Sequence, residues 1–359
     1  MNTSRKADID TAKGLGIILV SIYHLVYRPE NGTADIILCE LIWLFVPFFF
    51  VLSGWNFRDE RTLRENVMHR LKVLFLPALK YTMLLLLFGG IYCMAFHGCT
   101  AQDWLRDAIH TYLRPEFASA LLPEWGVGGI LFECISPVWF VWTMVLSYMV
   151  FYPVSGYALK DTACLCVSCV VLLSAGILLY GLGSHVSWSL TATPVYAAIM
   201  LCGAWLSRHS GSIRPSVPVA AAAVVLHAVM YHFCGNDYAF ASQLGTVGRW
   251  SVIPFFVQTF TGGYAVYVFC KLCPEHITKI LAFVGRNSFR FLLLHGIFAM
   301  IASDLLHTYI KLSPDRWYVE SVTPEVFAKS VMVWVFSVIC CTVFCMVQER
   351  REILKGGKY

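Results

Sequence analysis

The sequence predicts an all-α, polytopic membrane protein with about ten transmembrane helices and both termini in the cytoplasm. Of the 359 residues, 58% are hydrophobic and only 14% are charged. The mean hydropathy is +0.66. A water-soluble globule needs more polar surface than this composition supplies, so soluble classes are excluded. The spacing of the apolar runs and the distribution of basic residues give the remaining evidence.

Ten apolar stretches have about the length that a bilayer-spanning helix needs. They cover residues 14–28, 36–57, 73–97, 130–153, 162–181, 186–206, 216–234, 250–270, 280–304 and 326–347. No small-residue cleavage site follows the first stretch, so we expect it to be retained. We therefore expect one membrane domain over residues 1–359. Residues 1–13 form its cytoplasmic N-terminus, residues 98–129 a large outer loop and residues 348–359 a basic cytoplasmic tail.

Basic residues set the predicted orientation. Nineteen of the 27 Lys and Arg residues fall in the termini and the loops on their side, and seven fall on the opposite side. Loops rich in Lys and Arg stay in the cytoplasm, so both termini are expected there. The net charge of +5 is then an orientation signal and indicates no nucleic-acid partner. The basic inner face suits a phosphorylated cytosolic ligand and anionic lipid headgroups equally well.

The first apolar stretch carries Lys13 and His24 on one helical face. Eleven residues make three turns plus about 20°, and they separate the two side chains by roughly 16 Å along the axis. Asp10 joins this face if the helix begins early. An ionisable side chain inside a span usually faces a protein interior or a wet cavity, and histidine can move protons near neutral pH. The sequence leaves a functional role and a packing role for His24 equally open.

Other clusters also have two interpretations. The basic run before Pro77, formed by Arg58, Arg61, Arg64, Arg70 and Lys72, is either a cytoplasmic anchor or a phosphate clamp.

On the outer side, Trp104, Leu105, Ile109 and Leu113 have helical spacing, which predicts a helix lying along the membrane interface. We expect Trp125 either to cap a cavity or to contact an extended substrate. Glu133 and Ser136 share one helix side, as a site or as an interfacial pair. The 14 cysteines lie mostly in apolar runs, where Cys behaves as a small apolar residue, so no metal site is expected.

These pieces, in this order, resemble acyltransferase family 3, the ten-helix bacterial membrane enzymes that O-acylate cell-envelope sugars. The matching features span nearly the whole chain: Asp10 with the Lys13-x10-His24 pair, Phe48-Phe-Phe-Val-Leu-Ser-Gly-Trp55, the basic run into Pro77, Pro137-Val-Trp-Phe140, and Gly285-Arg-Asn-Ser-Phe-Arg-Phe-Leu-Leu-Leu-His295. The family often has two arginines three apart before the proline. Here the aligned places read Arg70-Leu-Lys72-Val73, so the second arginine is missing, and we expect Lys72 or the Arg61 and Arg64 pair to substitute for it.

The resemblance implies an enzyme of the bacterial cytoplasmic membrane. Its co-substrate would be acetyl-CoA or another acyl-CoA from the cytoplasm, and the acceptor a hydroxyl of a carbohydrate or glycolipid at the outer face. No metal and no nucleic acid are implied. By position, Lys13 and His24 match the basic residue and histidine held to be essential in the family.

On this basis we expect His24 to act as general base, with Glu133 and Asp10 in the same catalytic group. The residues expected to hold the donor are Lys13, Arg70, Lys72, Arg286, Arg290 and His295, and those expected to hold the acceptor are Ser136, Trp139 and Trp125. A covalent acyl-histidine is the rival mechanism. A transporter or flippase for a small molecule or lipid-linked sugar, and a sensory module, are the alternatives from other classes. The acceptor, the acyl group, the oligomeric state and a Cys99 to Cys234 pairing stay open.

Overall fold

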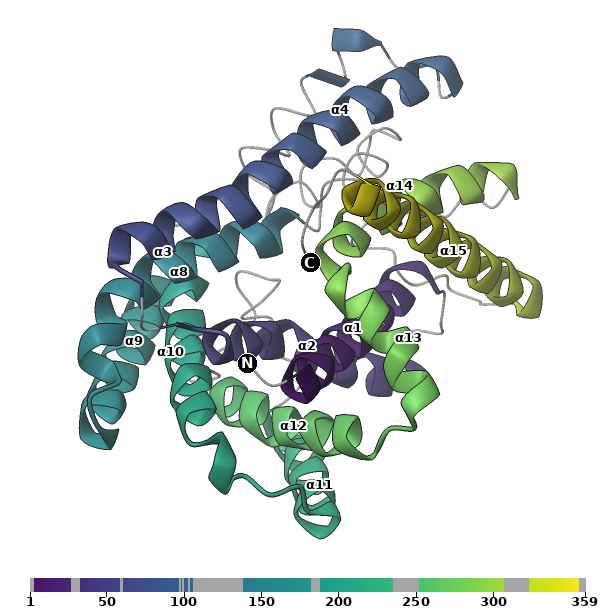
Figure 1. Cartoon of the computed structure of the whole chain (residues 1–359). Coiled ribbons are helices and arrows are strands. Elements are labelled where there is room, and N and C mark those ends of the chain that lie inside the picture. The colour runs from purple at the N-terminus through teal and green to yellow at the C-terminus, as the bar shows by residue number, and fades with distance from the viewer. Residues whose placement is uncertain are drawn as a thin grey trace. The chain divides into compact units, whose positions relative to one another are not determined.

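The structure, a computed structural model, describes most of the chain as helices. The described residues are 3–26, 33–58, 61–96, 98, 100–102, 104–105, 138–181, 188–234, 252–306 and 323–354. Within these ranges no strand occurs, which confirms the predicted all-α class (Figure 1). The chain divides into two compact units, each built from separate chain segments.

Unit one comprises Met1–Ile42, Lys80–Val138 and Glu275–Tyr359. Its helices are α1 (Thr3–Leu25), the first part of α2 (Thr33–Trp55), most of α4 (Leu76–Phe96), α13 (Glu275–Arg286), α14 (Ser288–Leu305) and α15 (Pro324–Leu354). Helix α1, purple in Figure 1, lies along α13 and also contacts α14 and α15. Leu25, Ala299, Ala302 and Val333 form a buried apolar cluster that joins α1, α14 and α15.

Two glycines bring the backbones of α1 and α13 into direct contact. A methyl group at Gly14 would collide with the carbonyl of Leu281, and one at Gly285 would collide with the carbonyl of Asp10. Small residues at a helix crossing permit this close approach of the two backbones. The crossing therefore sets the position of Asp10 and its neighbours against the end of α13.

Unit two comprises Trp43–Leu79 and Trp139–Pro274. It contains the second half of α2 (Thr33–Trp55), then α3 (Leu63–Arg70), η1 (Leu71–Phe75), α8 (Val138–Ala158), α9 (Thr162–Gly181), α10 (Trp188–Arg208), η3 (Ser210–Ser212), α11 (Val217–Cys234) and α12 (Val252–Leu272). Helix α9 packs on α10, and α11 packs on α12.

The stretch from Val195 to Leu201 in α10 is fully buried. Gly54 and Gly203 allow α2 and α10 to approach backbone to backbone. Helix α10 is therefore a central packing element of unit two.

The junction between α3 and α4 is a π-helical segment, Leu71–Phe75. Pro77 follows it and has no backbone N–H, so the carbonyl of Val73 loses its usual α-helical donor. A local π turn is one way in which a helix accommodates such a break, and π segments often accompany functional sites. Lys72 is exposed within this segment.

Six helices among the described residues are long and apolar enough to cross a bilayer. They are Leu63–Phe96, Thr162–Leu179, Leu190–Arg208, Val252–Leu272, Ser288–Leu305 and Pro324–Leu354, and Leu44–Trp55 and Val217–Met230 are shorter apolar helices. These helices support a multi-pass membrane protein. The ten membrane crossings and the cytoplasmic location of both termini remain predictions.

Most helix boundaries differ from the predicted ones by a few residues, and three differences change an expected segment. Helix α1 begins at Thr3, within the predicted N-terminal segment 1–13. The predicted span 280–304 is divided between α13 and α14 at Asn287. The predicted tail 348–359 begins as helix, because α15 continues to Leu354. An apolar window does not mark where a helix begins, breaks or ends, since tertiary packing also holds polar stretches in a helical conformation.

Most of the predicted outer loop 98–129 lies outside the described residues. Trp104 is described, and its indole Nε1 donates to the carbonyl oxygen of Leu86 at 3.1 Å. Its ring lies against Gly89 and Gly90 of α4. Trp104 is therefore buried on α4, while the helix predicted through Ile109 and Leu113 falls on residues that are not described.

Replacing Gly285 with Ala should destabilise the protein, although Ala favours helices by about 1 kcal/mol over Gly. The added methyl group collides with the Asp10 carbonyl, and overpacking costs about 1–3 kcal/mol or more where backbone must move. We expect the detergent-solubilised variant to melt several degrees lower than the wild type. Gly211→Ala is the control, since a methyl group there meets open space. A Gly285→Ala protein as stable as the Gly211→Ala protein would contradict the contact.

Candidate functional site

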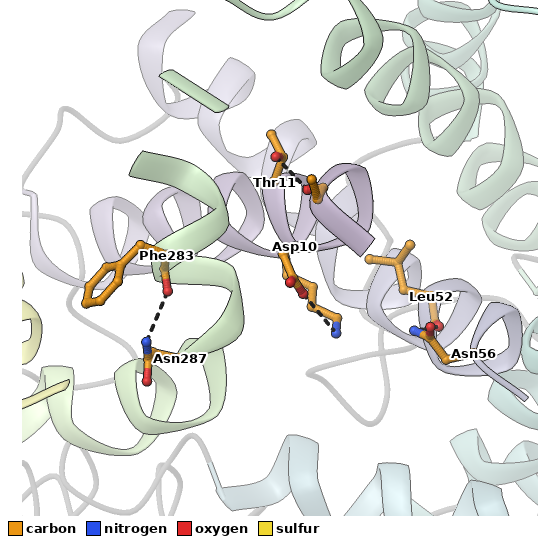
Figure 2. Close-up of polar contacts among 8 residues, drawn as sticks. Asp10, Thr11, Leu52, Asn56, Phe283 and Asn287 are labelled. Carbon is orange, nitrogen blue, oxygen red and sulfur yellow. Dashed lines mark hydrogen bonds and ion pairs between the residues drawn. The ribbon is translucent and has the colours of Figure 1, made fainter. Parts of the chain in front are cut away.

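Helix α1 carries Asp10 and Lys13 one turn apart, and His24 in its last turn. The Lys13 Nζ lies 3.8 Å from an Asp10 carboxylate oxygen, and both side chains are partly exposed. Figure 2 shows the Asp10 carboxylate and a dashed line that marks this ion pair. Because α1 begins early, Asp10 joins the face of Lys13 and His24, as the helical spacing requires. A partly exposed pair of this kind contributes little to stability.

The α13–α14 junction is built around Asn287, which is 2% exposed. Its side-chain nitrogen donates to the carbonyl oxygen of Phe283 at 3.1 Å, which Figure 2 shows. The same nitrogen donates to a Glu349 carboxylate oxygen of α15 at 2.7 Å. Asn287 thus joins the end of α13 to α15. Arg286, the residue before it, is exposed.

Arg290 is engaged with the same end of α15. Its guanidinium donates to the Asn287 side-chain oxygen at 2.8 Å and to a Glu352 carboxylate oxygen at 2.5 Å. These contacts use two of the five N–H donors that an arginine has. Arg290 therefore holds α14 and α15 together in this structure. If it also binds the acyl donor, it must do so through its remaining N–H groups.

His24 and His295 bring two imidazoles together. Their ring centroids are 5.8 Å apart, and the rings are tilted by 45°. His295 is 4% exposed, and its Nδ1 lies 2.9 Å from the Leu292 carbonyl oxygen and 3.1 Å from that of Phe291. A carbonyl only accepts, so Nδ1 carries the hydrogen and Nε2 is the basic nitrogen. Two groups suited to proton transfer thus meet inside unit one.

Side chains from α15 support this pair. The Ser337 hydroxyl donates to the His295 carbonyl oxygen at 2.8 Å, and the indole Nε1 of Trp334 donates to the Ser21 hydroxyl oxygen at 3.0 Å. Ser21 lies one turn before His24. Sequence reasoning missed all three residues, because their partners lie 42 and 313 positions away in the chain.

The basic residues before Pro77 belong to unit two. The Arg70 Nε donates to the Tyr152 hydroxyl oxygen at 2.9 Å, and the guanidinium carbon lies 4.3 Å from the centroid of the Tyr148 ring. Lys72, two residues after Arg70 in the chain, is exposed. A guanidinium stacked on one tyrosine and bonded to another has a fixed orientation.

The structure therefore places Asp10, Lys13, His24, Arg286, Arg290 and His295 in one unit, and Arg70 and Lys72 in the other. Trp139 is in the first turn of α8, where its backbone alone is described. Trp125, Glu133, Ser136 and Cys99 lie outside the described residues, as does the side chain of Cys234.

Two Cys-x-x-Cys pairs occur in the sequence, Cys166 with Cys169 and Cys270 with Cys273. Among the described residues, no group of three His, Cys, Asp or Glu side chains has the arrangement of a metal site. The sulfur of Cys169 instead lies 3.6 Å from that of Cys202.

The fold and the site together define a multi-pass helical membrane protein with an ionisable face inside one helical unit. Comparison with protein families then identifies the kind of protein. The chain belongs to acyltransferase family 3, whose acyltransferase domain matches residues 6–348 and so covers both units. Searches of curated proteins and of solved structures each returned no significant match.

The link between Arg290 and Glu352 should appear in a double-mutant cycle. We expect Arg290→Gln and Glu352→Gln each to lower stability, and the double variant to lose less than the sum. The coupling should be about 0.2–1 kcal/mol, because both side chains are partly exposed. Thermal or chemical unfolding of the four proteins measures it. The exposed pair Lys279 and Glu275 is a matched control within one helix, and strictly additive losses at Arg290 and Glu352 would refute the link.

Proposed function

We propose that this protein transfers an acyl group, acetyl being the expected one, from cytoplasmic acyl-CoA to a hydroxyl of a cell-envelope carbohydrate or glycolipid. Membership of an acyltransferase family supports the acyl-transfer chemistry. The observation that carries the mechanism is that His24, on the helix that also bears Asp10 and Lys13, pairs with His295 of α14. This arrangement supplies a proton acceptor and a separate cationic end within one unit.

In the proposed reaction, His24 removes the proton of the acceptor hydroxyl while the hydroxyl oxygen attacks the thioester carbonyl. The new C–O bond forms, the C–S bond breaks, and CoA leaves as a thiolate that is then protonated. A thioester is already activated, so alignment and one base account for most of what the enzyme must supply. Histidine suits the role because its ordinary titration range lies near neutral pH.

We assign His295 to the same proton rather than to donor binding. It is buried, its Nδ1 is committed to backbone carbonyls, and its ring faces His24. Its Nε2 can therefore receive a proton from His24 or keep the His24 ring in a productive orientation. A buried neutral imidazole is a poor partner for phosphates, which favour exposed cations.

The donor phosphates are assigned to the other end of α1. The crossing of Gly14 and Gly285 places the turn bearing Lys13 against the turn bearing Arg286. Lys13 is partly exposed and Arg286 is exposed, so both can meet a soluble anion. The roughly 16 Å of helix between Lys13 and His24 would be bridged by the extended arm of CoA between its phosphates and its thioester.

The acceptor side of the proposal rests on family resemblance. Ser136, Trp139 and Trp125 are proposed to contact the acceptor and Glu133 to orient His24. The protein is proposed to work in the bacterial cytoplasmic membrane, with both termini inside. Aromatic side chains such as Trp suit a sugar because their faces pack on its C–H surfaces.

His24→Ala should abolish acyl transfer without unfolding the protein, since a missing general base typically costs about 100- to 10,000-fold in rate. The assay is purified protein with labelled acetyl-CoA and candidate glycans, following CoA release and label transfer together. His276→Ala, at an exposed histidine of α13, is the matched control and should keep full activity.

Transfer retained by His24→Ala would refute the base assignment. Movement of a sugar lipid without CoA release would favour the transporter interpretation. Incubating the enzyme with labelled donor and no acceptor separates the two chemical routes: label stably attached to His24 would establish the acyl-histidine intermediate, whereas the proposed mechanism predicts none.

His295→Gln should lower kcat about 10-fold or more while leaving the KM for acyl-CoA near its wild-type value, because the residue acts on the proton and not on the donor. Steady-state kinetics over a range of pH measures both constants and should show an altered pH profile. A rise in the donor KM at unchanged kcat would instead place His295 among the donor-binding residues.

A further inference from the structure

Helix α15 is longer than one bilayer crossing requires. Its 31 residues extend over about 46 Å, whereas the hydrocarbon core of a bilayer is about 30 Å thick. The apolar stretch of this helix ends at Val347, and the helix continues to Leu354. We therefore expect the last two turns of α15 to lie at the level of the lipid headgroups.

One side of these last turns is bound to the rest of unit one. A Glu349 carboxylate oxygen accepts from the Asn287 side-chain nitrogen at 2.7 Å, and a Glu352 carboxylate oxygen accepts from the Arg290 guanidinium at 2.5 Å. Residues three apart share one side of a helix. The acidic side chains are therefore directed toward the α13–α14 junction and are engaged there.

The other side of the same turns carries two arginines. Arg350 and Arg351 are exposed. Neither makes a hydrogen bond or ion pair with another residue that the structure describes. Residues 355–359, which follow the described helix, contain Lys355 and Lys358 and no Asp or Glu. The basic side chains thus face outward, away from the two engaged glutamates of the same helix.

An exposed apolar stripe leads along α15 to these arginines. Val343, Met346 and Val347 lie seven, four and three residues before Arg350, so all three share its side of the helix. All three are exposed. Further exposed apolar side chains continue the stripe toward the start of α15: Met332, Val335, Phe336 and Ile339. The outward side of α15 is therefore apolar along the membrane and basic where the helix leaves it.

This order of chemical groups matches that of a phospholipid. Acyl chains pack along apolar side chains, and an arginine guanidinium can donate two parallel hydrogen bonds to one phosphate. Basic residues next to the cytoplasmic end of a span also attract the anionic lipids of the inner leaflet. Ile353 and Leu354 are exposed beside the arginines and extend the apolar contact to the edge of the chain region.

We propose that the outward side of the inner end of α15 binds an anionic phospholipid. Its phosphate would contact Arg350 and Arg351, and its acyl chains would lie along Val343, Met346 and Val347. A second copy of the chain suits this surface less well. In a dimer with its two-fold axis normal to the membrane, the arginines of one copy would face those of the other, and like charges repel. The proposal does not depend on the proposed acyl transfer.

The test is a titration of the full chain, purified in detergent, with phosphatidylglycerol and with phosphatidylcholine, followed by native mass spectrometry. The wild type should bind phosphatidylglycerol more tightly. Arg350→Gln combined with Arg351→Gln should weaken phosphatidylglycerol binding about 10- to 30-fold and leave phosphatidylcholine binding nearly unchanged. Arg350→Lys combined with Arg351→Lys keeps both charges and should retain most of the preference for the anionic lipid.

A matched control removes the same charge elsewhere. Arg64→Gln combined with Arg214→Gln changes two exposed arginines of unit two and should bind both lipids like the wild type. Val343→Ser combined with Val347→Ser should weaken binding of both lipids, because it removes contacts with the acyl chains that the two lipids share. Arg350→Gln alone serves if the double glutamine variant fails to fold.

Two results would overturn the proposal. One is a wild type without preference for phosphatidylglycerol, or with a preference that the control pair lowers as much as the Arg350 and Arg351 pair does. The other is a dimer that dissociates when Val343 and Val347 are replaced, in the absence of any lipid preference, which would assign this surface to a second copy of the chain.

Discussion

The contact between α1 and α13 at Gly14 and Gly285 determines where the ionisable residues of unit one lie. No side chain separates the two backbones at this point, so the helices can neither slide nor rotate without a collision. Asp10 and Lys13 are consequently fixed near Arg286, and the remaining length of α1 carries His24 to His295. The helix crossing thus connects the part of α1 that bears Lys13 to the part that bears His24 through rigid structure, as the proposed mechanism requires of groups that must stay aligned.

Polar contacts extend this arrangement to α15, which bonds to the other helices at three levels. Trp334 reaches Ser21 on α1, Ser337 reaches the backbone of His295, and Glu349 and Glu352 reach the α13–α14 junction. Polar side chains in a membrane protein commonly join helices in this way. The α15 contacts keep the His295 backbone, and with it the imidazole pair, in place.

The sequence predicted the helical class, most helix positions and the shared face of Lys13 and His24, because apolar length and helical periodicity are local signals. It did not predict that α1 begins at Thr3, because the charged residues near the N-terminus keep that part of the helix out of any long apolar stretch. It also missed Trp334 and Ser337, whose partners are distant in the chain. It assigned Arg61 to the basic run before Pro77 but used Lys160 and Arg208 only to predict the orientation, because the proximity of these three residues depends on how the helices of unit two pack.

The proposed acyl transfer requires the acyl donor to reach His24 along α1, with its phosphates near Lys13. The most direct measurement is a cryo-electron microscopy structure of the full chain with a non-hydrolysable acetyl-CoA analogue. We expect density for the acetyl carbonyl within hydrogen-bond reach of His24 or of the position of the acceptor hydroxyl. We also expect density for the phosphates beside Lys13. An analogue bound away from α1, or a His24 ring with no path to the bound acetyl group, would contradict it.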